Sequence, residues 1–199
     1  VLRLKNKRNY ITPHFTMKKL LFITLISVLF SCQNSSENLS DIKSQFTKET
    51  PDVINIDNIE KLELNTVSDE QTVALIAKTI YPGKSDFDLK EIVGNSIFHL
   101  FSYTSINKKF DRYMVVQERG CKSTFFCIIT DKSGNVTDVN RSMRNDCELV
   151  YKVVGNFQDN GDFSVETSTE AYLLPELNIQ QYIFSNEGKI IEEPFQELR

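Results

Sequence analysis

The sequence predicts an α+β domain in which one N-terminal helix packs on an antiparallel β-meander of about six or seven strands. From residue 96 onward, segments rich in β-branched and aromatic residues alternate with turn sequences that contain Gly or Asn. A stretch with helical periodicity precedes them. The same pattern also allows an alternative fold, a closed or nearly closed β-barrel of the lipocalin type.

The helix is expected over residues 69–80. Ser68 and Gln71 have the spacing of a capping box, and Pro82 with Gly83 ends the periodic stretch. Residues 85–93 form a second, shorter candidate helix. Four apolar residues fall on one face of the first helix: Val73, Ile76, Ala77 and Ile80.

The strands follow from composition and from the turns between them. Gly120, Gly134, Gly161 and Gly188 each lie in a turn sequence where a hairpin needs a positive φ. The six clearest strand segments are 97–103, 112–118, 124–130, 149–154, 163–167 and 181–184.

The segment from Met17 to Cys32 has the composition of an export signal. Lys18 and Lys19 are followed by an apolar run, 20–30, which is too short to span a bilayer. The run ends in Leu29-Phe30-Ser31-Cys32, and this sequence resembles the lipobox of bacterial lipoproteins. The resemblance implies cleavage before Cys32, acylation of that cysteine and a lipid anchor in the cell envelope, which we expect to be the outer membrane.

The chain is therefore expected to have four parts. Residues 1–16 precede the start at Met17 and are expected to lie outside the natural coding sequence. Residues 17–31 form the signal peptide, and residues 32–51 form the lipidated cysteine with a polar, flexible tether. Residues 52–199 form a single domain, as expected for a chain of this length.

The exported part of the chain is strongly acidic. Residues 1–31 hold six of the 23 basic residues and none of the 27 acidic ones, so the remainder has 17 basic residues and a formal net charge of −10. This balance repels phosphate backbones, and no basic stripe with interleaved aromatic residues overrides it. Nucleic acid is not an expected partner.

Three cysteines remain after Cys32, in a chain bound for an oxidising compartment. Alternate turns of a meander lie at the same end of the sheet, which favours a disulfide between Cys121 and Cys147. A bond between Cys127 and Cys147 is the weaker alternative. Cys127 lies within an apolar strand segment, where we expect a buried and inert thiol.

No catalytic, metal or cofactor motif is evident. His99 is the only histidine after the signal, and it is expected to be a half-buried structural residue on a strand beside Ile97 and Phe101. No Gly-x-Ser-x-Gly, Cys-x-x-Cys or phosphate-binding Gly-rich sequence accompanies it.

The segment 140–146 is the candidate recognition loop. Arg141 and Arg144 flank Met143 on an otherwise acidic chain, and we expect these three residues to bind a partner. The sequence thus predicts a membrane-anchored envelope lipoprotein that binds a protein, a peptide or an envelope component without catalysis. The alternative is a small envelope enzyme or a carrier of apolar ligands, with a cavity in the β-sheet domain.

Overall fold

Eleven strands, two α-helices and one short 3₁₀ helix make up the structure, a computed structural model that describes residues 38–46, 50–56, 62–145, 151–169, 177–194 and 196–198. All of these residues belong to one unit, Asn38–Arg199. The helices are η1 (Lys43–Gln45), α2 (Glu70–Ile80) and α3 (Asp86–Gly94). The strands are β1 (Val53–Asn55), β2 (Asn65–Thr66), β3 (Ile97–Ser105), β4 (Phe110–Arg119), β5 (Lys122–Asp131), β6 (Val136–Asn145), β7 (Tyr151–Phe157), β8 (Phe163–Thr169), β9 (Leu177–Phe184), β10 (Ile190–Glu192) and β11 (Gln196–Leu198).

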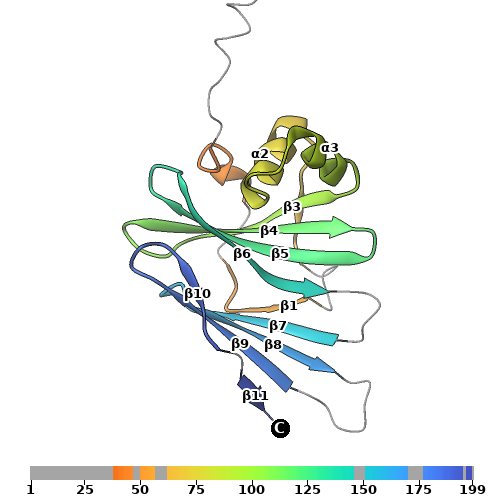
Figure 1. The fold of residues 1–199 in the computed structure, drawn as a ribbon. Coiled ribbons are helices and arrows are strands. Elements are labelled where there is room, and N and C mark those ends of the chain that lie inside the picture. Colours follow the sequence, from red (N-terminus) through yellow and green to blue (C-terminus); the bar gives the residue numbers. More distant parts are fainter. Residues whose placement is uncertain are drawn as a thin grey trace, which may run out of the picture. The chain divides into compact units, whose positions relative to one another are not determined.

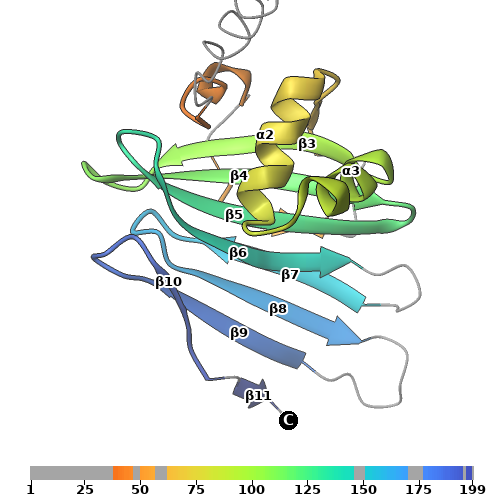
Figure 2. The same ribbon diagram turned by 45° about the horizontal axis from the view of Figure 1, so that its top comes forward.

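The strands form two antiparallel sheets. The five-stranded sheet has the order β2-β3-β4-β5-β6, and the six-stranded sheet has the order β1-β7-β8-β9-β10, with β11 paired to β9. Figures 1 and 2 show three layers: the helices, the five-stranded sheet and the six-stranded sheet. The five-stranded sheet is the middle layer, so both of its faces are covered.

The burial pattern of the strands explains this layering. Eight consecutive residues of β4, from Phe110 to Gln117, are buried, as are six consecutive residues of β5, from Phe125 to Thr130. Such continuous burial requires a cover on both faces of the sheet. In β8, by contrast, Phe163 and Val165 are buried while Ser164 and Glu166 between them are partly exposed, as in a sheet with one solvated face.

Each face of the five-stranded sheet has its own hydrophobic core. Between the sheets, Phe101, Met114 and Phe125 pack with residues of the six-stranded sheet such as Val153 and Phe163. On the helix side, the core is formed by the inward residues of α2 and the alternate residues of β3, β4 and β5. Its members include Ile76, Ala77, Ile80, Phe98, Leu100, Tyr113, Val115, Phe126 and Ile128.

The two helices begin at side-chain caps. Asp69 caps α2, and its carboxylate accepts a hydrogen bond from the backbone N–H of Thr72 at 2.8 Å. Hydrogen bonding by the Thr72 side chain, together with this backbone hydrogen bond, lowers the pKa of the Asp69 carboxyl. The cap is therefore Asp69 rather than the predicted Ser68. Ser85 caps α3 in the same way, accepting from the N–H of Asp88. Within the described residues, none of the helices is both long and apolar enough to cross a bilayer.

The predicted β-rich domain with helices is confirmed, but the single meander of six or seven strands is wrong. The strands β3 to β6 form one consecutive meander and β7 to β10 form a second, in a different sheet. The alternative of a lipocalin-like barrel is also wrong, because both sheets are open. Residues on both faces of β4 are buried, so each face of its sheet needs a covering layer. A single meander covered by a helix on one face leaves the other face open to solvent, and here the second sheet covers it.

The predicted tether, residues 32–51, is wrong for its middle part. Leu39, Ile42 and Phe46 are buried in the helix-side core, and the Phe46 ring meets the Tyr113 ring edge-on at 5.0 Å. Their spacing lets all three apolar side chains pack against the sheet. The free energy gained by burying them outweighs the preference of the surrounding polar residues for solvent. Residues 32–37 and 47–49 lie outside the described residues.

Candidate functional site

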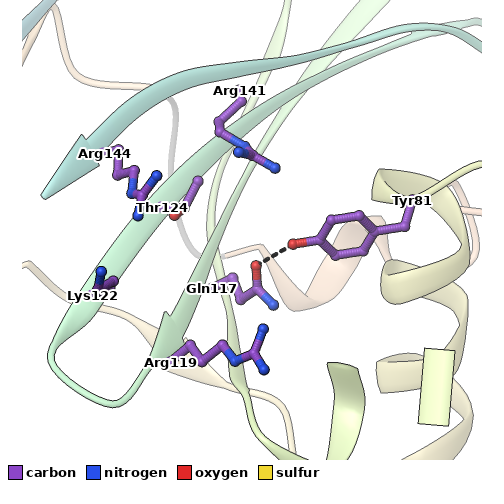
Figure 3. A pocket seen from close by; sticks show the side chains of 7 residues that line it. All are labelled: Tyr81, Gln117, Arg119, Lys122, Thr124, Arg141 and Arg144. Atoms are coloured by element: carbon purple, nitrogen blue, oxygen red, sulfur yellow. Dashed lines mark hydrogen bonds between the residues drawn. The ribbon is translucent and has the colours of Figure 1, made fainter. Parts of the chain in front are cut away.

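A basic pocket of about 430 Å³ lies on the helix side of the five-stranded sheet, where the β4–β5 hairpin turns. Figure 3 shows its side chains, which come from the residue that follows α2 and from three adjacent strands. The lining residues are Tyr81, Gln117, Arg119, Lys122, Thr124, Arg141 and Arg144.

The β4–β5 hairpin places four of these residues. Arg119 pairs with Lys122 across a two-residue turn, and Gln117 pairs with Thr124 two residues further along the ladder. Residues two apart on a strand share a face, so all four side chains lie on the helix side of the sheet. Gly120 is the first of the two turn residues and has φ +61°. A two-residue hairpin turn requires a positive φ at this position, which glycine adopts readily.

A β-bulge in β6 brings the other two arginines into the pocket. Phe125 pairs with Met143 and Phe126 pairs with Arg141, so Ser142 is an extra residue in the ladder. In a regular strand of this sequence, Arg141 and Arg144 would lie on opposite faces, because they are three positions apart, and the bulge puts them on the same face. The Ser142 hydroxyl is buried and donates to the carbonyl oxygen of Phe125 at 3.2 Å.

The opposite wall of the pocket is neutral and held by hydrogen bonds. The Tyr81 hydroxyl donates to Gln117 Oε1 at 2.6 Å, and Gln117 Nε2 donates to the Ser96 hydroxyl at 2.8 Å. The Tyr81 ring also packs edge-on against the Phe126 ring at 5.8 Å. Since Gln117 is buried and held at both ends, this wall is fixed before any ligand arrives.

The electrostatics of the pocket run against those of the whole domain. Four of the seven described lining residues are cationic and none is acidic, although the chain from Cys32 carries a formal net charge of −10. Within the part of the chain that the structure describes, Arg119 and Arg141 form no ion pair. The Arg141 guanidinium lies over the Phe126 ring at 5.7 Å, which orients it without neutralising its charge. The pocket is therefore suited to an anion.

The structure separates the three predicted binding residues. Arg141 and Arg144 line the pocket, but Met143 is 2% exposed and packs in the core between the sheets. The predicted recognition loop is also wrong, because residues 140–145 belong to strand β6. Its asparagines are poor strand formers, and pairing with the apolar strand β5 overrides that preference.

Five lining residues were absent from the predicted site: Tyr81, Thr124, Gln117, Arg119 and Lys122. The signal for the last two is the turn at Gly120, because a two-residue hairpin sets Arg119 opposite Lys122. Gln117 follows from strand alternation. Tyr81 follows only from the packing of α2 on the sheet.

The cysteines are partly as predicted. Cys121 is disulfide-bonded, and Cys127 is a buried free cysteine. The last pair in the β5–β6 ladder joins Ser123 to Asn145, and each predicted bonding partner is two residues beyond one member of that pair. Cys147 and the lipidation candidate Cys32 lie outside the described residues, so the Cys121–Cys147 bond stays a prediction.

The Cys127 thiol is expected to be inert in the folded protein. Complete burial between the sheets raises its pKa to about 12, so at pH 8 only about one molecule in ten thousand carries a thiolate there. Iodoacetamide at pH 8 should leave the Cys127 peptide unmodified in the native protein and alkylate it fully in denaturant, as read by peptide mass mapping. Rapid native alkylation would show that the core between the sheets opens.

A buried cation lies in the core between the sheets, away from the basic pocket. Arg112 of β4 is 2% exposed, and its guanidinium lies over the Phe157 ring at 5.1 Å. Burial lowers the pKa of this guanidinium. It faces the six-stranded sheet, so it does not contribute to the basic pocket.

His99 lies away from the basic pocket. It is 7% exposed on β3, with Nδ1 3.0 Å from the Thr66 hydroxyl and Nε2 3.5 Å from a carboxylate oxygen of Glu118. Glu118 and its neighbour Gln117 point to opposite faces of β4, so His99 is on the side opposite the pocket. No group of three potential metal ligands occurs among the described residues.

An apolar groove of about 680 Å³ runs between α2 and α3. Val73 and Ala77 line it from α2, and Leu89 and Val93 line it from α3. The alternative function, a carrier of apolar ligands, predicts a cavity in the β-sheet domain, whereas this groove lies between the helices. Between the sheets, phenylalanine side chains pack in the core, and the centroids of the Phe101 and Phe125 rings are 5.9 Å apart.

Searches for similar proteins found no matching protein family, no matching curated protein and no matching solved structure.

Proposed function

We propose that this chain is a lipoprotein anchored in the outer membrane, whose domain binds an anionic envelope component or partner in the basic pocket without catalysis. The convergence of Arg119, Lys122, Arg141 and Arg144 on one side of the sheet is the observation that supports binding. The apolar run 20–30 followed by Cys32 supports the anchor.

The arrangement favours binding over chemistry. The pocket offers cationic and hydrogen-bonding groups, and its described lining contains no carboxylate, histidine or thiol to act as a base or nucleophile. Four cations from three strands of one sheet are held on a rigid support, which suits recognition of a defined anion.

The anchor is tested by the intact mass of the membrane-extracted protein. The wild type is expected to have the mass of residues 32–199 plus acyl chains, and a Cys32→Ala variant is expected to lose that mass. An unlipidated mass for the wild type would contradict the anchor while leaving the binding proposal in place.

Anion binding is tested by thermal unfolding at constant ionic strength with added citrate, sulfate or phosphate. A ligand that binds only the folded state raises stability by about 2.7 kcal/mol at one hundred times its dissociation constant. At least one of these anions should raise the Tm of the wild type and leave an Arg119→Gln/Arg141→Gln variant unchanged.

The matched control is Lys90→Gln/Lys152→Gln, which removes the same charge from exposed positions on α3 and β7. This control should respond to the anion as the wild type does. An equal response in the pocket variant, or none in the wild type, would overturn the proposed binding site.

A further inference from the structure

We infer that the basic pocket binds a phosphate group carried by a small polar molecule that is not a lipid headgroup of the anchoring bilayer. This inference rests on the proposed function, because it takes the pocket to be the binding site and names its ligand class.

The charge of the pocket indicates a ligand with more than one negative charge. Arg119 and Arg141 form no ion pair within the described residues, so the chain itself does not neutralise these two charges. A phosphomonoester has close to two negative charges at neutral pH, so it neutralises several cations at one point.

The donor geometry favours phosphate over a carboxylate. Three of the four cations are arginines, whose planar guanidinium groups donate paired hydrogen bonds to two oxygens of one group. Figure 3 shows the Arg119 and Arg141 guanidinium groups on either side of the Gln117–Tyr81 hydrogen bond. Three terminal phosphate oxygens can serve guanidinium groups that arrive from different strands, whereas a carboxylate has two.

The neutral wall determines what surrounds the phosphate. Tyr81 and Gln117 are locked to each other at 2.6 Å, and Thr124 adds a hydroxyl from β5. These groups present an aromatic ring and polar atoms beside the cations. A pocket of about 430 Å³ has room for a molecule of the size of a sugar phosphate.

The position of the pocket argues against the bilayer as the source of the phosphate. Asn38 and Ser40 pack against Gly134, beyond the end of β5, whereas Lys122 of the pocket begins that strand. The nine steps from Lys122 to Asp131 span about 30 Å of extended chain. Asn38, the first described residue, therefore lies at the end of the sheet remote from the pocket, and Cys32 is six residues earlier in the sequence.

The test is calorimetric titration of the full chain in a neutral detergent, at constant ionic strength, with glucose 6-phosphate, inorganic phosphate, succinate and glucose. Glucose 6-phosphate and phosphate are expected to bind, and succinate and glucose are not. Arg141→Gln should weaken glucose 6-phosphate binding about tenfold or more, as expected for loss of a charged hydrogen bond. Lys152→Gln on β7 is the charge-matched control and should leave the affinity unchanged.

Preferential binding of succinate would overturn the phosphate assignment while leaving anion binding in place. The phosphate assignment would also be overturned, and anion binding would remain, if neither glucose 6-phosphate nor inorganic phosphate bound while citrate raised the Tm. Absence of any anion response would overturn the proposed binding function itself.

The source of the phosphate is tested with the chain reconstituted in vesicles of phosphatidylcholine alone or mixed with phosphatidylglycerol. Equal affinity for glucose 6-phosphate in both vesicles is expected. Weaker affinity in the phosphatidylglycerol vesicles would show that bilayer headgroups occupy the pocket, and would overturn the assignment to a molecule outside the bilayer.

Discussion

Replacement of Phe125 by alanine is expected to lower the free energy of unfolding by about 3–5 kcal/mol. Phe125 is fully buried in the core between the two sheets, where its ring meets the Phe101 ring edge-on at 5.9 Å. Both sheets are held by hydrogen-bonded ladders, so they cannot move together to fill the space that the ring leaves. The lost contacts and the cavity therefore both contribute to the loss.

Urea unfolding followed by circular dichroism measures this effect. Phe87→Ala is the control, because Phe87 is 78% exposed on α3 and surface substitutions usually change stability by less than about 0.5 kcal/mol. A Phe125→Ala loss close to that of the control would mean that the core between the sheets does not hold the layers together.

Gly188→Ala is expected to have the second largest effect, a loss of about 2–5 kcal/mol. Gly188 has φ +74° in the turn before β10, and a left-handed conformation costs a residue with a Cβ about 1–2 kcal/mol. The added Cβ would also clash with the ring of Phe110, which packs against the Phe184 ring at 5.6 Å. Overpacking of this kind costs a further 1–3 kcal/mol or so.

Gly83→Ala separates the two contributions. Gly83 has φ +81° after α2, and a Cβ there would meet no atom within 4 Å. It should therefore lose only the conformational part, about 1–2 kcal/mol. Both variants are compared by urea unfolding, and equal losses would show that the Phe110 ring moves aside without cost.

Much of the secondary structure is predictable because its signals are local. The helix expected over 69–80 is observed as Glu70–Ile80, since its apolar spacing lies within the helix and its cap directly precedes it. The positive φ of Gly120, Gly134 and Gly188 also follows from turn sequences. Residues 140–145 were expected to be a loop, and they form part of strand β6 because they pair with β5, which their own sequence does not reveal.

The candidate site was predictable only in part. Arg141 and Arg144 attract attention as cations on an acidic chain, but Met143 between them belongs to the core. The spacing of Arg141 and Arg144 in the sequence does not predict that they share a face of the strand. They do so because of the β-bulge at Ser142, which forms only when β6 pairs with β5. Tyr81 joins the site only because α2 covers that face of the sheet.

The sequence by itself determined the β-rich composition, the helix and its end, the hairpin turns and the acidic character of the domain, because each depends on neighbouring residues or on composition. It also carries the lipobox-like segment that ends at Cys32. Only the tertiary structure decided that the strands divide into two sheets, that residues 38–46 join the core and that four cations converge on one pocket. These features depend on burial and strand register between segments far apart in the chain, which no local pattern specifies.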